Sequence, residues 1–175
     1  VTDPVKGYNS YPAWTLFPSK SIMYRHALLR ITYQCPESLK CGEWDYIDKV
    51  LIRRKGGISE DTLNFEIARM ISPYGSRFTS DWKFSWTADI TDFAPLFHDS
   101  LEIEFIHTGY ESNKDRGWLV TVTFELTEGT PAMELLGMEE FWKGNFPYGD
   151  TANSIESYLS PRKFKTPEGT AISRL

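Results

Sequence analysis

Apolar and polar residues alternate over several short stretches of this 175-residue chain. The clearest stretch is 101–107, where leucine, isoleucine and phenylalanine lie one way and Glu102 and Glu104 lie the other. A period of two residues is typical of a β-strand with two unlike faces. The same period predicts strands over 22–34, 46–54, 63–71, 84–90 and 118–126, with imperfect alternation at 50–52.

The stretch 63–71 has two interpretations, because its alternation suits a strand while its composition also tolerates a helix. A turn, Ser72-Pro73-Tyr74-Gly75, follows, and the position before a proline disfavours helix. We therefore predict a strand. About seven short strands between turn signals, without a long amphipathic helix pattern, predict an all-β sandwich or jelly roll.

The flanks of the strand-rich region differ from it in composition. Residues 1–21 contain three prolines and are predicted to be an irregular segment, serving as a lid or a first edge strand. Residues 22–131 form the predicted β-sandwich. Residues 132–175 are rich in Gly, Pro, Ser and Asn, and we interpret them as an extended linker leading into a truncated second domain.

Composition and charge narrow the function classes. Aromatic residues make up 15% of the chain, which suits a β-rich fold and also suits carbohydrate binding. Nineteen basic against 24 acidic residues give a net charge of -5, without a basic stripe, so we expect no nucleic-acid partner. No apolar run approaches the roughly 18 residues that cross a bilayer, so we expect no membrane span.

The two cysteines, Cys35 and Cys41, are close in sequence and have two interpretations. They can form a local disulfide, which would indicate an oxidising compartment and hence a secreted or periplasmic protein, or they can be buried free thiols. The three histidines, His26, His98 and His107, show no metal-ligand spacing. We therefore predict no metal site.

The best candidate chemistry follows the second cysteine. Glu43 and Asp45 flank Trp44 and would project to the same side of an extended segment, so their pKa values can be pushed apart to give an acid and a base. The alternative is a turn aspartate at a strand entrance with Glu43 in solvent. The loop 108–117 offers Tyr110 as a stacking ring and Glu111 as an acid, or is a solvated hairpin.

Several motifs in order resemble a known family. The run Cys35-Pro-Glu-Ser-Leu-Lys-Cys41-Gly-Glu-Trp-Asp45 resembles the N-terminal domain of the bacterial peptide-N-glycosidase F type. The further motifs that resemble this family are Phe65-Glu-Ile-Ala-Arg-Met-Ile-Ser-Pro-Tyr74, Asp89-Ile-Thr-Asp-Phe93, Leu101-Glu-Ile103, Gly129-Thr-Pro131 and Pro147-Tyr-Gly149. The likeness runs from about residue 24 to residue 150.

The resemblance implies an eight-stranded antiparallel jelly-roll-type β-sandwich, followed by a second such domain that completes the active-site cleft. It implies hydrolysis of the amide between asparagine and the innermost N-acetylglucosamine of N-glycans, without a cofactor, on N-linked glycoproteins or glycopeptides. Asp45 takes the catalytic role, with Trp44, Glu43 and Tyr46 beside it as substrate-binding candidates. The pair Cys35 and Cys41 takes the family's disulfide.

The sequence departs from this family at two positions of the expected site. Tyr46 stands where the family has an arginine, and Ile106 stands where it has a second acid, for which Tyr110 and Glu111 are possible substitutes. A third acid belongs to the second domain. We therefore expect this chain alone to be an incomplete enzyme. Two alternatives are an inactive N-glycan or glycopeptide-binding module and an interaction domain with only architectural likeness.

Overall fold

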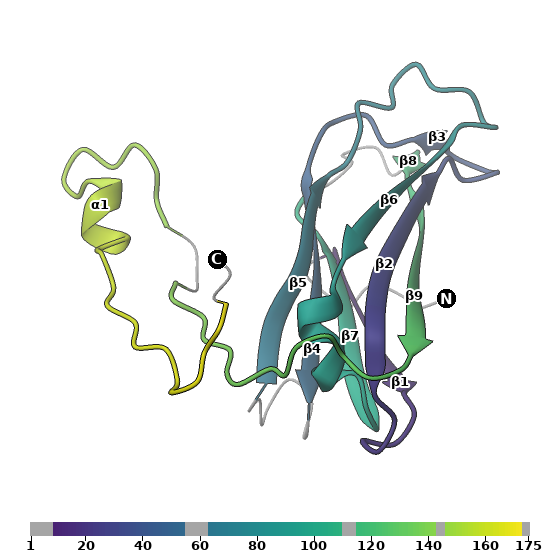
Figure 1. The fold of residues 1–175 in the computed structure, drawn as a ribbon. Helices are drawn as coiled ribbons and strands as arrows, with labels where there is room; N and C mark the ends of the chain where they lie inside the picture. Colours follow the sequence, from purple (N-terminus) through teal and green to yellow (C-terminus); the bar gives the residue numbers. More distant parts are fainter. Residues whose placement is uncertain (1–8, 55–62, 110–114, 143–145, 173–175) are drawn as a thin grey trace. The chain divides into compact units, whose positions relative to one another are not determined.

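The structure is a computed structural model, and it describes residues 9–54, 63–109, 115–142 and 146–172. The chain divides into two compact units, residues 1–132 and residues 133–175. Figure 1 shows the strands of the first unit and the short helix of the second.

Two antiparallel sheets form the first unit. The four-stranded sheet has the order β1 (Asn9–Leu16), β7 (Ser100–His107), β4 (Ile47–Arg54), β5 (Leu63–Ile71). The three-stranded sheet has the order β6 (Lys83–Asp89), β2 (Tyr24–Gln34), β9 (Leu119–Glu128). This arrangement confirms the predicted all-β antiparallel sandwich. The described residues contain seven long strands, where eight were expected.

A two-residue parallel pair stands apart from these sheets: β3 (Lys40–Cys41) lies beside β8 (Arg116–Gly117). A 3₁₀ helix, η1 (Thr91–Leu96), follows β6. The ambiguous stretch 63–71 is a strand, as predicted.

The core lies between the two sheets and is made by the apolar faces of their strands. The most deeply buried side chains are Ala27, Leu29, Ile31, Tyr33, Val50, Ile52, Ile90, Phe97 and Leu101. Aromatic rings join the two sheets where Tyr33 of β2 contacts Phe105 of β7, and Phe17, just after β1, contacts both Phe97 and Phe124. Alternation in β2, β4 and β7 therefore produces the core that it predicts.

The imperfect alternation near residue 50 has a structural cause. Between Val50 and Leu51 the register with β5 shifts, so that Val50 pairs with Ala68 and Leu51 pairs with Glu66. The extra residue on β5 is Ile67, which is buried. This β-bulge turns one more apolar side chain towards the core.

The first 21 residues are not irregular throughout, and the prediction is wrong for 9–16. These residues form β1, which pairs with β7 along its whole length and lies at the edge of its sheet. Pro12 is tolerated there because the outer side of an edge strand needs no backbone donor. The edge-strand alternative describes this segment.

The polar face of β7 is buried, although β7 is the cleanest alternating strand in the chain. Glu102 and Glu104 are only 4% and 6% exposed. Arg53 on β4 forms ion pairs with both carboxylates, and the Ser10 hydroxyl on β1 donates a hydrogen bond to Glu104. Because β7 is a central strand, its neighbours on both sides supply the partners that make these buried charges tolerable.

The second unit contains one short helix, α1 (Ile155–Tyr158). The Phe141 ring contacts the rings of Trp142 and Phe164, at centroid distances of 5.8 and 5.3 Å. Asp150 accepts a hydrogen bond from the Ala152 backbone at 2.8 Å. The interpretation of this segment as the approach to a second domain stays a prediction. No helix in the described residues has both the length and the apolar character that a membrane span requires.

Leu29 and Leu119 offer a matched test of the core. The Leu29 side chain is 0% exposed, whereas that of Leu119 is 47% exposed. We expect Leu29→Ala to lower the free energy of unfolding by about 3 kcal/mol, because it leaves a cavity. Leu119→Ala should change it by less than about 0.5 kcal/mol. Urea unfolding followed by circular dichroism measures both, and equal losses would contradict the described core.

Candidate functional site

The stretch from Gly42 to Tyr46 connects β3 to β4, and a disulfide and a parallel pair hold its start. Cys35 and Cys41 form the disulfide, with their Cα atoms 4.6 Å apart, which confirms the first of the two interpretations. The Gly42 N–H donates to the Gly117 carbonyl at 2.8 Å. The chain therefore enters the candidate site from a fixed point.

Two glycines let the backbone approach the Trp118 indole closely. A Cβ atom on Gly42 would overlap the Trp118 ring, and one on Gly75 would lie 2.5 Å from both the Gly42 carbonyl and the Trp118 ring. The Gly75 N–H donates to the Gly42 carbonyl at 3.0 Å. The Trp118 ring in turn contacts Tyr33 and the aromatic residues of the 78–82 segment. Packing on the Trp118 indole therefore fixes the loops that contain Gly42 and Gly75.

Ser72 fixes the other end of the stretch. Its side chain is 1% exposed. The Ser72 N–H donates to the Tyr46 carbonyl at 2.8 Å, and the Ser72 hydroxyl accepts from the Tyr46 N–H at 2.9 Å. The same hydroxyl lies 3.3 Å from the Trp44 carbonyl, to which it donates. Both peptide groups that flank Asp45 are thus tied to one buried serine.

Trp44, Asp45 and Tyr74 form the exposed part of the site. The Trp44 and Tyr74 rings meet edge to face at 5.3 Å, and their side chains are 48% and 51% exposed. The exposed Asp45 carboxylate makes no hydrogen bond or ion pair with the described part of the chain. Partial burial, followed by the charges of Asp45 and Glu43, raises the pKa of the Tyr74 hydroxyl. A free carboxylate therefore lies beside two rings that can stack on a ligand.

Glu43 lies near this group but has a cationic neighbour of its own. Its Oε2 is 3.3 Å from the Nε of Arg116, and the Arg116 side chain is only 19% exposed. Glu43 and Asp45 therefore differ in environment, because only Glu43 has this ion pair among the described residues. The difference arises from Arg116, a residue that sequence reasoning did not include.

Tyr46 is half-buried and packs on a residue of β7. Its ring lies edge to face with the His107 imidazole at 5.3 Å, and a Cβ atom on Gly109 would overlap it. The His107 Nδ1 is 2.6 Å from Oδ1 of Asp48, which is fully buried, and the Tyr33 hydroxyl donates to the other Asp48 oxygen.

Sequence reasoning missed Asp48, His107 and Tyr33 as a group. The only sequence signal was the parity of β4, which puts Asp48 on the same face as the buried Val50 and Ile52. Tyr110 and Glu111, predicted as substrate-binding residues, lie outside the described residues.

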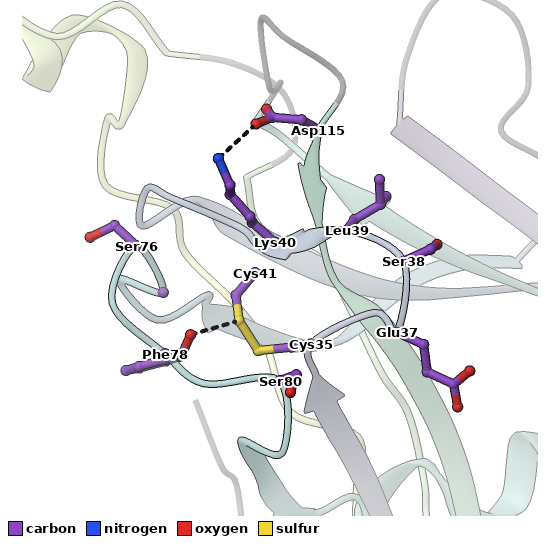
Figure 2. Close-up of a pocket in the computed structure, with 11 residues that line it drawn as sticks. Cys35, Glu37, Ser38, Leu39, Lys40, Cys41, Ser76, Phe78, Ser80 and Asp115 are labelled. Atoms are coloured by element: carbon purple, nitrogen blue, oxygen red, sulfur yellow. Dashed lines mark hydrogen bonds and ion pairs between the residues drawn. A yellow bond between two sulfur atoms is a disulfide. The ribbon is translucent and has the colours of Figure 1, made fainter.

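A pocket of about 460 Å³ lies beside the disulfide, as Figure 2 shows. It is lined by Cys35, Glu37, Ser38, Leu39, Lys40, Cys41, Gly75, Ser76, Phe78, Ser80 and Asp115. The Lys40 ammonium is 3.3 Å from the Asp115 carboxylate across its rim. None of the predicted site residues from Glu43 to Tyr46 lines it. Among the residues that the structure describes, no group of three His, Cys, Asp or Glu side chains could hold a metal ion.

The fold and the site together define an antiparallel β-sandwich that presents a carboxylate and two aromatic rings on a disulfide-braced loop. Three solved structures have a similar fold: PNGase F, a glycosylasparaginase from Flavobacterium meningosepticum; a peptide-N(4)-(N-acetyl-β-D-glucosaminyl) asparagine amidase; and recombinant peptide: N-glycanase F. Their TM-scores are 0.52, 0.52 and 0.54, each at 23% sequence identity.

These similarities cover 75% of this chain and 41–42% of the length of the three solved chains. This chain thus spans less than half of the proteins that it resembles. No protein-family model and no curated protein matches it. The resemblance that the motifs predict is confirmed for the fold.

Gly75 and Gly117 offer a matched test of the packing below the site. A Cβ atom on Gly117 would meet nothing within 4 Å. We expect Gly75→Ala to lower the free energy of unfolding by about 1–3 kcal/mol, because backbone and a packed indole must move apart. Gly117→Ala should change it by about 0.5 kcal/mol or less. Urea unfolding followed by tryptophan fluorescence compares them, and a silent Gly75→Ala would refute the close approach.

The pKa of the Tyr33 hydroxyl determines how the free energy of unfolding changes with pH in the alkaline range. Burial first, and then the charge of Asp48, raises the pKa of the Tyr33 hydroxyl. The unfolded chain releases this proton at about pH 10, whereas the folded chain keeps it to higher pH. The stabilisation is therefore present below about pH 10 and is lost as pH rises.

In Tyr33→Phe we expect the alkaline loss of unfolding free energy to be shallower, by up to about 1.4 kcal/mol per pH unit. Urea titrations at several pH values between 8 and 11 measure this slope in both proteins. Identical slopes would show that the Tyr33 proton does not contribute.

Proposed function

We propose that this chain is the domain of a glycoamidase that carries its catalytic carboxylate, Asp45, and that the enzyme hydrolyses the glycosyl-asparagine amide of N-glycans. The observation that carries this proposal is the exposed Asp45 carboxylate, which has no partner among the described residues and lies beside the exposed rings of Trp44 and Tyr74. The likeness of the fold to three peptide-N-glycosidases supports it.

The chemistry suits these residue types. In the reaction the oxygen of water bonds to the asparagine side-chain carbonyl carbon while the bond from that carbon to nitrogen breaks. The leaving nitrogen gains a proton, and the products are an aspartate and a glycosylamine. Asp45 orients the water and accepts its proton, which is general-base catalysis. Trp44 and Tyr74 offer apolar ring faces to the sugar, and Glu43 remains near its partner Arg116.

The substrates in this proposal are N-linked glycoproteins or glycopeptides, and the partner is a second β-sandwich domain of the same protein. The disulfide suits a secreted or periplasmic location, because such compartments keep disulfides oxidised. Tyr46 supplies no cation after Asp45, because a tyrosine side chain has no cationic form, and its ring packs on His107. This position favours a second candidate, a glycopeptide-binding module without catalysis.

Asp45→Asn tests the proposal in the full-length natural protein. We expect the release of N-glycans from a denatured glycoprotein to fall by roughly 10²–10⁴-fold, because the amide cannot accept the proton of water. Glu128→Gln, which changes an exposed acid at the far end of β9, is the matched control and should keep normal release. Mass spectrometry of a defined glycopeptide measures the conversion of asparagine to aspartate.

Two results would reject this assignment. Normal release by Asp45→Asn would remove Asp45 from the mechanism. If the unmodified protein bound glycopeptides in calorimetry but released no glycan, the binding-module function would replace the enzyme.

A further inference from the structure

A buried polar group joins the two sheets directly behind the candidate site. Asp48 on β4 is 0% exposed and receives hydrogen bonds from Tyr33 on β2 and from Nδ1 of His107 on β7. Asp48 and His107 are also paired in the sheet register. Burying a carboxylate in a core costs free energy unless donors satisfy it, so this arrangement requires all three side chains.

His107 is held at one nitrogen and not at the other. Its Nδ1 faces Asp48, while its Nε2 has no hydrogen-bond partner in the described part of the chain. Its side chain is 17% exposed. A carboxylate at Nδ1 selects the tautomer with the proton on Nδ1 and fixes the plane of the imidazole. The orientation of the His107 imidazole is therefore fixed.

This fixed ring supports the residue that follows Asp45. The Tyr46 ring packs edge to face on His107 at 5.3 Å, with Gly109 against it. The backbone makes the same connection, because the N–H of Thr108 donates to the Ile47 carbonyl at 3.1 Å. Ser72 holds the Tyr46 peptide from the other side. A rotation of the imidazole would therefore displace Tyr46 and, through it, the Asp45 peptide.

We propose that His107, oriented by Asp48, is a positioning residue of the candidate site that holds Tyr46 and thereby sets the place of the Asp45 carboxylate. The inference rests on the proposed function for its readout in catalysis. Tyr33 acts one step further away, since it contacts Asp48 and not His107.

The test uses the full-length protein with glycopeptide as substrate. We expect His107→Gln and Asp48→Asn each to lower kcat by roughly 10- to 100-fold, with KM changed by less than about threefold, because the reacting group is misplaced while the ligand surface remains. The double variant should lose little more than either single one, since both act through one contact. Tyr33→Phe should have the smallest effect.

A second measurement does not need activity. With ¹⁵N-labelled histidine and tryptophan, we expect the His107 signals of the unmodified protein to show the Nδ1–H tautomer, and those of Asp48→Asn to lose it. The Trp44 indole signal should shift in both Asp48→Asn and His107→Gln. The control is Leu101→Ala, which weakens the buried start of β7, at the opposite end of that strand from His107, and should leave the Trp44 signal and kcat per folded molecule unchanged.

The outcomes separate this inference from the proposed function. Inactive Asp45→Asn together with wild-type kcat in His107→Gln would overturn the positioning role alone. Active Asp45→Asn would overturn the proposed function, and the Trp44 signal would then decide about His107. If the Trp44 signal did not move, or if His107→Gln lost no more kcat per folded molecule than Leu101→Ala, His107 would be a packing residue and not a positioning residue.

Discussion

The antiparallel pairing of β4 with β7 is the constraint on which both the core and the candidate site depend. This pairing places Val50 opposite Phe105 and Ile52 opposite Ile103 in the core. Where β4 begins and β7 ends, the same register sets Asp48 opposite His107. There a hydrogen bond between the two side chains replaces apolar contact. The strand that buries the centre of the sandwich therefore also delivers Asp45, three residues before Asp48, to its rim. A slip by one residue would turn every one of these side chains to the other face.

Much of the fold could be predicted because it depends on local periodicity. The strands over 63–71 and 101–107 follow from alternation, and the disulfide follows from two cysteines close in sequence. Contacts between distant residues carry no such signal. The Trp44 and Tyr74 rings are 30 positions apart, and Asp48 meets a histidine 59 positions further along the chain. The burial of Glu104 depends on an arginine from another strand. Sequence periodicity assigns a face to each residue, but the sheet order decides what covers that face.

The fold and the candidate site support the proposed function to different degrees. The likeness to three glycosidase structures concerns the course of the backbone, and one fold can host several functions. The functional argument therefore depends on side chains: a carboxylate with no partner in the part of the chain that the structure describes, two exposed rings, and an acid held by an arginine. Tyr46 is informative for the same reason. It replaces an expected cation with a neutral ring that packs on His107, so the charge around Asp45 differs from what the motif alone implies.

The disulfide between Cys35 and Cys41 separates the segment that lines the pocket from the segment that carries Asp45. Residues 37–40 lie between the bonded cysteines and line the pocket, while Asp45 lies beyond Cys41, where Gly42 and Ser72 fix the backbone independently. Substitutions or insertions between the cysteines can therefore change the shape of the pocket wall without being transmitted to the carboxylate.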